Sequence, residues 1–241
     1  MKKNILITGA NKGIGEYIAK ILSNEKNNII GTSRSSKGIN KINKYLKNKG
    51  KGIILNIEKK KDIKKKIKII YKKFKTIDIL INNAGIIKDS CFLKMKKKNW
   101  KKVLNVNLNS NFYLLKKILP NMIKNKYGRI IFIGSIIGSI GNIGQTNYAT
   151  SKSGLIGLNK SIALEVAKYG ITSNIISPGY IQTNINKHLN KKQKKKILSK
   201  IPMKRFGKKK EIAYAVKFLI SNKASYITGQ NLHINGGMYM I

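Results

Sequence analysis

Residues 3–22, KNILITGANKGIGEYIAKIL, place a short apolar run directly before a glycine-rich loop and a helical pattern. The run at 3–8 predicts a buried strand, and the loop that follows has glycines at positions 9, 13 and 15. Glycines let the backbone approach a ligand closely, and the N-terminus of the next helix offers unpaired N–H groups and the positive end of a dipole. The helical spacing is carried by Ile14, Ile18, Ile21 and Leu22. This order of elements predicts a site for the pyrophosphate of a dinucleotide.

The rest of the chain repeats the alternation of apolar strand and amphipathic helix. Further strands are predicted at 28–33, 52–57, 77–81, 129–134, 171–177 and 227–234, and helices at 39–49, 59–74, 99–119, 148–169 and 208–221. The strands are too apolar to be half exposed. The pattern therefore predicts an α/β fold, a single Rossmann-type doubly wound parallel sheet of about seven strands with helices on both faces. We expect one domain over residues 1–241, with a cofactor-binding half at about 1–135 and a catalytic and substrate half at about 135–241.

The end of the second predicted strand bears on the choice of nicotinamide cofactor. An acidic residue there would bind the adenosine ribose hydroxyls, but the chain has none, and Arg34 follows the strand instead. Lys12 in the first glycine loop is a second cation that could meet a 2′-phosphate, although it is also one of many lysines. These residues favour NADP(H) over NAD(H).

A second constellation lies at residues 135–152, SIIGSIGNIGQTNYATSK. Tyr148 and Lys152 are four residues apart, which on a helix puts both side chains on one face. A phenol must drop about three pKa units to act as an acid near pH 7, which is roughly 4 kcal/mol, and one ammonium at about 4 Å supplies roughly that much. A hydroxyl from Ser135 would bind the carbonyl oxygen that Tyr148 protonates. The alternative is a packed aromatic side chain beside a solvated lysine.

Three further segments have polar residues in informative places. The sequence NNAG, residues 82–85, follows a predicted strand, where small and amide residues suit a cofactor crevice. Asn107 lies on the apolar stripe of the predicted helix at 99–119, so it is either a structural hydrogen-bond hub or part of the site. Residues 184–205 are polar and rich in lysine, and we expect them to form a mobile lid over the substrate.

The chain is strongly basic, with 51 Lys and Arg against 8 Asp and Glu and a formal net charge of +43. A polyanion-binding protein on this scaffold is therefore one alternative. Nearly all of the charge is lysine spread over every polar face, however, and Asn and Ile are also abundant. This pattern indicates a composition bias, so we expect no specific nucleic-acid partner.

The cysteines, the histidines and the lengths of the apolar runs limit which other classes of protein this chain can belong to. Cys91 is the only cysteine, so no intrachain disulfide is possible, and a cytoplasmic location fits. No apolar run reaches about 18 residues, so we expect no membrane span. His188 and His233 lack neighbouring acids or cysteines, and no metal site is predicted.

These motifs, together with Asn107 and the PG of SPGYIQT, resemble the short-chain dehydrogenase/reductase family over the whole chain. Within the family, the chain is most similar to bacterial reductases that act on 3-oxoacyl-[acyl-carrier-protein]. The resemblance implies NADPH-dependent reduction of 3-oxoacyl chains in fatty-acid elongation. It implies that Tyr148 is the general acid, that Lys152 lowers its pKa and holds the nicotinamide ribose, that Ser135 positions the carbonyl, and that Asn107 supports a water relay. The implied cofactor contacts are Gly9, Ala10, Asn11, Lys12, Gly13, Ile14, Gly15, Arg34, Asn56, Ile57, Asn83, Ala84, Gly85, Tyr148, Lys152 and Ile181.

The resemblance also implies partners. Acyl carrier protein is small and acidic, and we expect basic residues near the mouth of the site to dock it, with Lys124, Lys126, Arg129 and Lys168 as candidates. The family implies a homotetramer built through helices near 99–124 and 148–168 and the C-terminal tail. Enoyl reductases of the same superfamily space the tyrosine and lysine further apart, so the four-residue spacing favours a ketone reductase. A related reductase of acetoacetyl-CoA or another small ketone stays open as an alternative.

Overall fold

The computed structural model describes residues 2–25, 27–182 and 190–241. Within them one sheet contains seven parallel strands in the order β3-β2-β1-β4-β5-β6-β7. The strands are β1 (Asn4–Ile7), β2 (Asn28–Ser33), β3 (Gly50–Ile54), β4 (Ile79–Asn82), β5 (Gly128–Ile133), β6 (Ile171–Pro178) and β7 (Asn231–Ile234). The predicted Rossmann-type parallel sheet is therefore confirmed.

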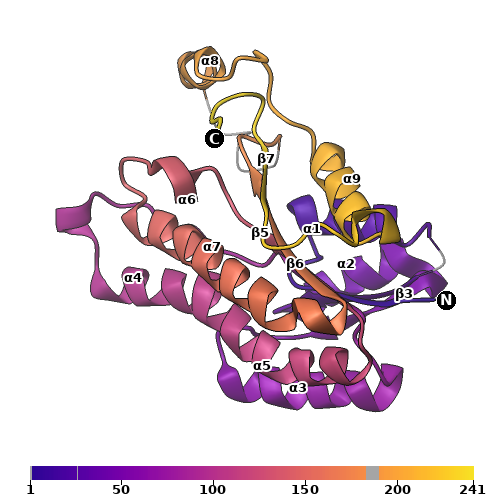
Figure 1. Cartoon of the computed structure of the whole chain (residues 1–241). Coiled ribbons are helices and arrows are strands. Elements are labelled where there is room, and N and C mark those ends of the chain that lie inside the picture. The colour runs from indigo at the N-terminus through magenta and orange to yellow at the C-terminus, as the bar shows by residue number, and fades with distance from the viewer. Residues whose placement is uncertain (1, 26, 183–189) are drawn as a thin grey trace.

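Helices cover both faces of this sheet (Figure 1). One face is covered by α1 (Gly13–Leu22), α2 (Ser36–Leu46) and α9 (Lys209–Leu219), and the other by α3 (Lys60–Phe74), α5 (Ser110–Lys124) and α7 (Thr146–Val166). Three shorter helices are α4 (Lys97–Leu104), α6 (Ile137–Ile140) and α8 (Lys191–Ser199). No helix among the described residues is both long and apolar enough to cross a membrane.

The strands are buried on both sides, which explains their unbroken apolar runs. Along β1, Ile5 and Ile7 face the α1–α2–α9 layer, whereas Leu6 faces the α3–α5–α7 layer. Strand β4 repeats this alternation, with Leu80 on the side of Leu6. A strand with period-two side chains fills both cores only if every position is apolar.

Several element boundaries differ from the prediction for local reasons. Helix α2 begins before residue 39 because the Ser35 hydroxyl caps it, accepting from Gly38 N at 3.2 Å. Strand β3 starts at Gly50 and ends at Ile54, not at residue 57, and the last strand is Asn231–Ile234, shorter than the predicted 227–234. The predicted helix at 99–119 is helical throughout, but it consists of α4, a π-helical turn at Asn105–Asn109 and α5, which continues to Lys124.

The strand order fixes where a ligand can bind. The order reverses between β1 and β4, since β2 and β3 lie on one side of β1 and β4 to β7 on the other. Loops that leave the carboxyl ends of β1 and β4 therefore diverge and leave a crevice. The glycine loop follows β1 and the NNAG segment follows β4, so both predicted cofactor motifs lie at this crevice.

Candidate active site

The glycine loop is held to the end of β4 by hydrogen bonds. The Thr8 hydroxyl accepts from the backbone N–H groups of Asn83 and Ala84, each at 3.0 Å. The Asn83 side-chain amide in turn donates to the carbonyl oxygens of Thr8 at 2.9 Å and Gly9 at 3.2 Å. The two motifs that the sequence singled out separately therefore form one bonded unit.

The same unit fits a pyrophosphate. Gly9 and Gly13 have φ of +69° and +63°, a backbone region that glycine adopts without strain. A Cβ on Gly15 would lie only 2.4 Å from Asn83 Nδ2 and 2.6 Å from Gly9 O, so a larger residue would push the loop apart. No side chain caps α1 at Lys12. The first turn of α1 thus presents backbone N–H groups toward the crevice, as anion binding at a helix N-terminus requires.

Two cations lie where the adenosine of the cofactor is expected, which we call the adenosine corner. Lys12 and Arg34 are both exposed, and neither forms an ion pair with an acidic residue in the described part of the chain. A Cβ on Gly38 would lie 3.2 Å from Asn11 Cβ, so the glycine loop passes next to the first turn of α2. This contact brings the loop that carries Lys12 close to the chain that leaves β2 at Arg34.

Asn56 and Ile57 follow β3 at the same edge of the sheet. Asn56 Oδ1 accepts from Glu58 N at 3.1 Å, and Asn56 N donates to Asp62 Oδ2 at 2.7 Å. Ile57 is buried. A shallow hollow of about 410 Å³ opens beside Asn56, between it and the start of α3. The oxygen of the Asn56 amide is thus committed to the local turn.

Ser135 and Tyr148 meet across the loop between β5 and α7. Ser135 follows the last strand residue, Ile133, by two positions, and its Oγ accepts from Ile137 N at 3.2 Å. The Tyr148 pKa is raised, chiefly because burial disfavours the phenolate; a side-chain hydrogen bond with Ser135 opposes this rise, and the carboxylate of Asp89 adds to it. Ser135 and Tyr148 therefore lie close enough to interact, and the role of each toward a substrate carbonyl stays a prediction.

Lys152 lies one helical turn further along α7 and is almost fully buried. Its Nζ donates to Ile133 O at 2.7 Å and lies 5.7 Å from the centroid of the Tyr148 ring. Burial lowers the pKa of Lys152 to about 8. In this arrangement the ammonium faces the end of β5 and not the phenol, and the lowering of the Tyr148 pKa by Lys152 stays a prediction.

Asn107 lies at the centre of the π-helical turn. Its Oδ1 accepts from Ile86 N at 2.8 Å, and its Nδ2 donates to Ile86 O at 3.0 Å and Ser151 Oγ at 3.1 Å. A Cβ on Gly85 would lie 3.3 Å from Asn107 Oδ1 and 3.8 Å from Lys152 Nζ, so all three groups lie together. The sequence left two readings of Asn107 open, and the structure supports both: it is a hydrogen-bond hub located beside the site.

Sequence reasoning missed a polar clamp at the mouth of the site. Gln145 Nε2 donates to both carboxylate oxygens of Asp89, at 3.1 and 3.2 Å, and Ser90 N donates to Gly144 O at 2.8 Å. These bonds join the loop after NNAG to the glycine loop before Tyr148. Asp89 is one of only eight acidic residues, which was the available signal.

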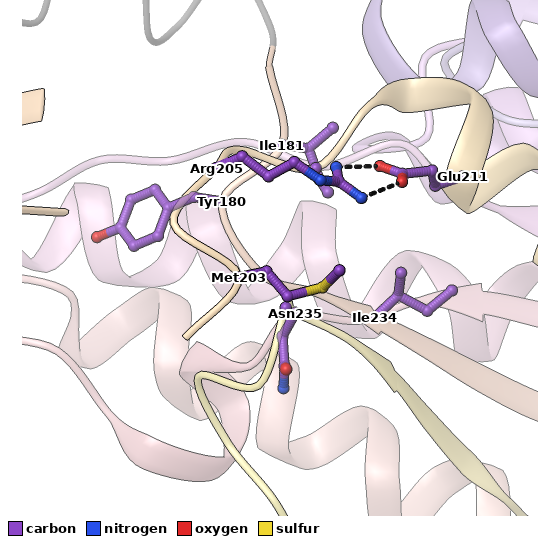
Figure 2. Close-up of a pocket in the computed structure, with 9 residues that line it drawn as sticks. Tyr180, Ile181, Met203, Arg205, Glu211, Ile234 and Asn235 are labelled. Atoms are coloured by element: carbon purple, nitrogen blue, oxygen red, sulfur yellow. Dashed lines mark hydrogen bonds and ion pairs between the residues drawn. The ribbon is translucent and has the colours of Figure 1, made fainter. Parts of the chain in front are cut away.

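A small cavity of about 200 Å³ lies beneath the segment that follows β6 (Figure 2). Ile181 pairs there with Gly207, whose N–H donates to Tyr180 O at 2.9 Å and whose carbonyl accepts from Gln182 N at 2.8 Å. Arg205 binds both carboxylate oxygens of Glu211, at 2.6 and 3.0 Å, and closes one side of the cavity. This frame supports the backbone at Ile181, the expected contact for the nicotinamide end.

The predicted docking residues do not lie near the catalytic end. Arg129 is only 4% exposed, and its Nη1 donates to Gly128 O and Gly170 O, so it is not a surface residue. Lys124 and Lys126 precede β5, and Lys168 precedes β6, whereas Ser135 follows β5. A six-residue strand separates these ends by about 20 Å. Within one chain these lysines therefore lie at the opposite edge of the sheet from Ser135, and their role in docking stays a prediction.

Two other expectations concern residues of the last third. His188 and the first part of the proposed lid, up to residue 189, lie outside the described residues. The remainder of 184–205 contains α8. His233 on β7 has its ring edge-on to Tyr239, with centroids 5.0 Å apart. No group of three or more His, Cys, Asp or Glu that could hold a metal occurs among the described residues.

A parallel sheet with a glycine loop after β1, and a Ser–Tyr–Lys group at the carboxyl end of β5, defines a nicotinamide-dependent oxidoreductase. The family model described as "Enoyl-(Acyl carrier protein) reductase" matches residues 9–239. The chain belongs to the short-chain dehydrogenase/reductase family.

The sequence of this chain aligns with those of its relatives over almost their full length. The chain is 58% identical over 240 residues to the 3-oxoacyl-[acyl-carrier-protein] reductase FabG of Buchnera aphidicola subsp. Baizongia pistaciae, covering 99% of this chain and 98% of that protein. It is 47% identical over 238 residues to the protein of that name from Haemophilus influenzae and 46% identical over 239 residues to that from Escherichia coli K12, with the same coverage.

Proposed function

We propose that this protein reduces 3-oxoacyl chains on acyl carrier protein to 3-hydroxyacyl chains, using NADPH, in fatty-acid elongation. The observation that carries the proposal is the closeness of Ser135, just beyond the carboxyl end of β5, to Tyr148, which lies one helical turn from buried Lys152 on α7. Relatives that share about half of its residues or more are named 3-oxoacyl-[acyl-carrier-protein] reductase. The four-residue spacing of the tyrosine and lysine supports a carbonyl substrate.

In this mechanism the substrate carbonyl oxygen lies between two hydroxyl groups. Ser135 Oγ donates a hydrogen bond to that oxygen and polarises the carbonyl. Tyr148 then transfers its phenolic proton to the oxygen as carbon is reduced. A nicotinamide cofactor, when bound, supplies the hydride. The raised pKa of Tyr148 keeps the phenol protonated until the oxygen becomes basic.

Lys152 and Asn107 restore the proton that Tyr148 has given to the substrate. The Lys152 pKa of about 8 lets this side chain exchange a proton near neutral pH. Asn107 bonds to both backbone groups of Ile86 and so holds the chain that borders Lys152. A water on the Ile86 carbonyl would connect Lys152 to solvent along this path. Lys152 would turn from Ile133 O toward the nicotinamide ribose.

The choice of NADPH is supported by the adenosine corner. Lys12 and Arg34 provide two exposed cations, and Ser33 ends β2 where an acid would bind the ribose diol. Each charged hydrogen bond to a phosphate contributes about 1.5–3 kcal/mol. We therefore assign NADP(H) instead of NAD(H) to this site.

We also propose a cytoplasmic homotetramer. Exposed apolar side chains on the helices expected to form the interface support it, notably Phe112 on α5 and Leu164 on α7, which is 84% exposed. Sedimentation of the purified protein would test the assembly. A single species of one-chain mass at micromolar concentration would contradict it.

The test of the activity is the absorbance of NADPH at 340 nm with acetoacetyl-carrier-protein as substrate. Rapid loss with this substrate, and little with NADH, is expected. Crotonyl-carrier-protein is the matched control, because the matching family model bears the name of an enoyl reductase. Faster oxidation with the crotonyl substrate would overturn the carbonyl assignment, and activity restricted to acetoacetyl-CoA would move the enzyme to another pathway.

A further inference from the structure

Helix α8 stands at the catalytic end of the molecule. Figure 1 shows it beyond the end of β7, at the same end as α6, which follows Ser135. The chain after α8 is tied to that end, because Met203 N donates to Gly236 O at 3.1 Å just beyond β7. Buried Ile201 contacts the same turn, since a Cβ on Gly236 would lie 2.9 Å from Ile201 Cγ2.

The first two turns of α8 project into solvent. Residues 191–196, KKQKKK, are all exposed, and only Ile197 and Leu198 are partly buried against the body. The helix start is well formed, because Asn190 and Gln193 cap each other reciprocally at 2.8 and 2.9 Å. The exposed face is therefore ordered by its own cap and not by contacts with the rest of the protein.

The charge of this face is not neutralised within the chain. Five of its six residues are lysines, and no ion pair among the described residues involves any of them. Lys191–Lys195 and Lys192–Lys196 are like charges at i, i+4, an arrangement that destabilises a helix by about 0.2–0.5 kcal/mol per pair. An acidic partner would remove this repulsion, so contact with an anionic surface stabilises α8 more than contact with solvent does.

Position distinguishes α8 from two other lysine-rich helices. Helices α3 and α4 also present many lysines, but α3 packs on the α3–α5–α7 face of the sheet and α4 packs against α7. The lysines that precede β5 and β6 lie at the opposite edge from Ser135. A carrier protein must deliver its substrate to the carboxyl edge, and α8 is a dense basic element located there.

We propose that the lysine face of α8, residues 191–196, docks an acidic helix of the acyl carrier protein. This inference rests on the proposed function, since it names the partner surface of that activity. Charge complementarity of this kind acts mainly on the rate of encounter and is screened by salt.

The test compares two triple variants of equal charge. Lys191→Gln/Lys192→Gln/Lys195→Gln removes three charges from α8 and keeps its capping residues, and Lys64→Gln/Lys68→Gln/Lys72→Gln removes three exposed charges from α3. Each is assayed with acetoacetyl-carrier-protein and with the neutral acetoacetyl thioester of N-acetylcysteamine. Circular dichroism checks that both variants keep the fold.

We expect kcat/KM for the carrier-protein substrate to fall about tenfold at low salt in the α8 variant and less than twofold in the α3 variant. The neutral thioester should be reduced equally by all three proteins, and the deficit should shrink as NaCl is raised. Equal losses in the two variants would overturn the docking surface and leave the proposed function intact. Turnover of the neutral thioester but not of the carrier-protein substrate by the unmodified protein would overturn both.

A second arm separates the carrier protein from polyanions in general. Unacylated carrier protein should inhibit the unmodified enzyme more strongly than the α8 variant. A single-stranded oligonucleotide of equal charge should inhibit less. An oligonucleotide that competes as well as the carrier protein, with the same dependence on α8, would contradict the assignment to an acidic protein helix.

Discussion

Lys152 Nζ donates a 2.7 Å hydrogen bond to the carbonyl oxygen of Ile133, the last residue of β5. The ammonium is therefore anchored to the strand that delivers Ser135 and not to the phenol one turn away on its own helix. Ile133 is itself buried, and so is Lys152. A buried lysine with a single neutral acceptor is a costly arrangement, which a protein keeps where the charge is needed for function.

Replacement of Lys152 by Met should change the pH dependence of stability. Folding lowers the pKa of Lys152 from 10.5 to about 8, so the unfolded chain binds more protons than the folded chain between these pH values. Stability of the unmodified protein should therefore rise over this window relative to Lys152→Met, by about 3 kcal/mol in total. Urea unfolding at pH 7 and pH 10.5 measures this difference in stability. The contributions of the other lysines cancel, because both proteins contain them.

Two outcomes of the comparison between Lys152→Met and the unmodified protein are decisive. Lys152→Met should lose turnover while its free energy of unfolding at pH 7 is at or above that of the unmodified protein. A stability difference that stays constant from pH 7 to 10.5 would contradict a buried, destabilised lysine.

Replacement of Asn107 by Ala should lower both stability and turnover. The variant leaves both backbone groups of Ile86 without their side-chain partner, and an unsatisfied buried group costs about 1–3 kcal/mol. Asn109→Ala is the matched control, because Asn109 lies in the same π-helical turn but is exposed. Thermal unfolding and steady-state assays compare the two. Equal behaviour of both variants would show that Asn107 is not the hub described here.

Replacement of Arg34 by Ala should weaken NADPH binding by about 10- to 100-fold, because a charged hydrogen bond to phosphate contributes about 1.5–3 kcal/mol. NADH binding should change little. Lys37→Ala, an exposed cation in the first turn of α2, serves as control. Fluorescence titration of each nucleotide gives the dissociation constants. A parallel loss for NADPH and NADH would remove Arg34 from recognition of the 2′-phosphate.

Replacement of Asp89 by Asn should shift the pH profile of reduction. The Asp89 carboxylate contributes to the raised pKa of Tyr148, so its neutralisation lowers that pKa. Tyr148 must be protonated to act as the acid, and activity falls as pH rises through its pKa. The alkaline limb of kcat/KM should therefore move to lower pH in Asp89→Asn. Glu25→Gln, an exposed acid paired with Lys217, should leave the limb in place.

The sheet could be predicted closely because its strands are fully buried and therefore continuously apolar. The strand order, with its reversal between β1 and β4, comes from the structure and was not predicted. The π-helical turn could not be predicted, since periodicity alone does not separate an α-helix of 21 residues from one with an inserted turn at Asn105–Asn109.

The site residues were predictable as a set, but their contacts were not. Spacing places Tyr148 and Lys152 on one helix face, yet the direction of the lysine depends on a carbonyl in a distant strand. Arg129 was a candidate docking residue, and only the fold shows that it donates to two carbonyl oxygens in the interior. Tertiary partners decide such cases, and sequence spacing does not contain them.

The most direct test of the account is a single turnover of acetoacetyl-carrier-protein by protein preloaded with NADPH, with and without Tyr148→Phe. Phe keeps the ring and removes only the hydroxyl that meets Ser135. The account predicts that the variant binds NADPH with nearly unchanged affinity and oxidises it at least about a hundredfold more slowly, since general acid catalysis contributes about 10²–10⁴. Oxidation by the variant at the rate of the unmodified protein would contradict the assignment of Tyr148 as the proton donor.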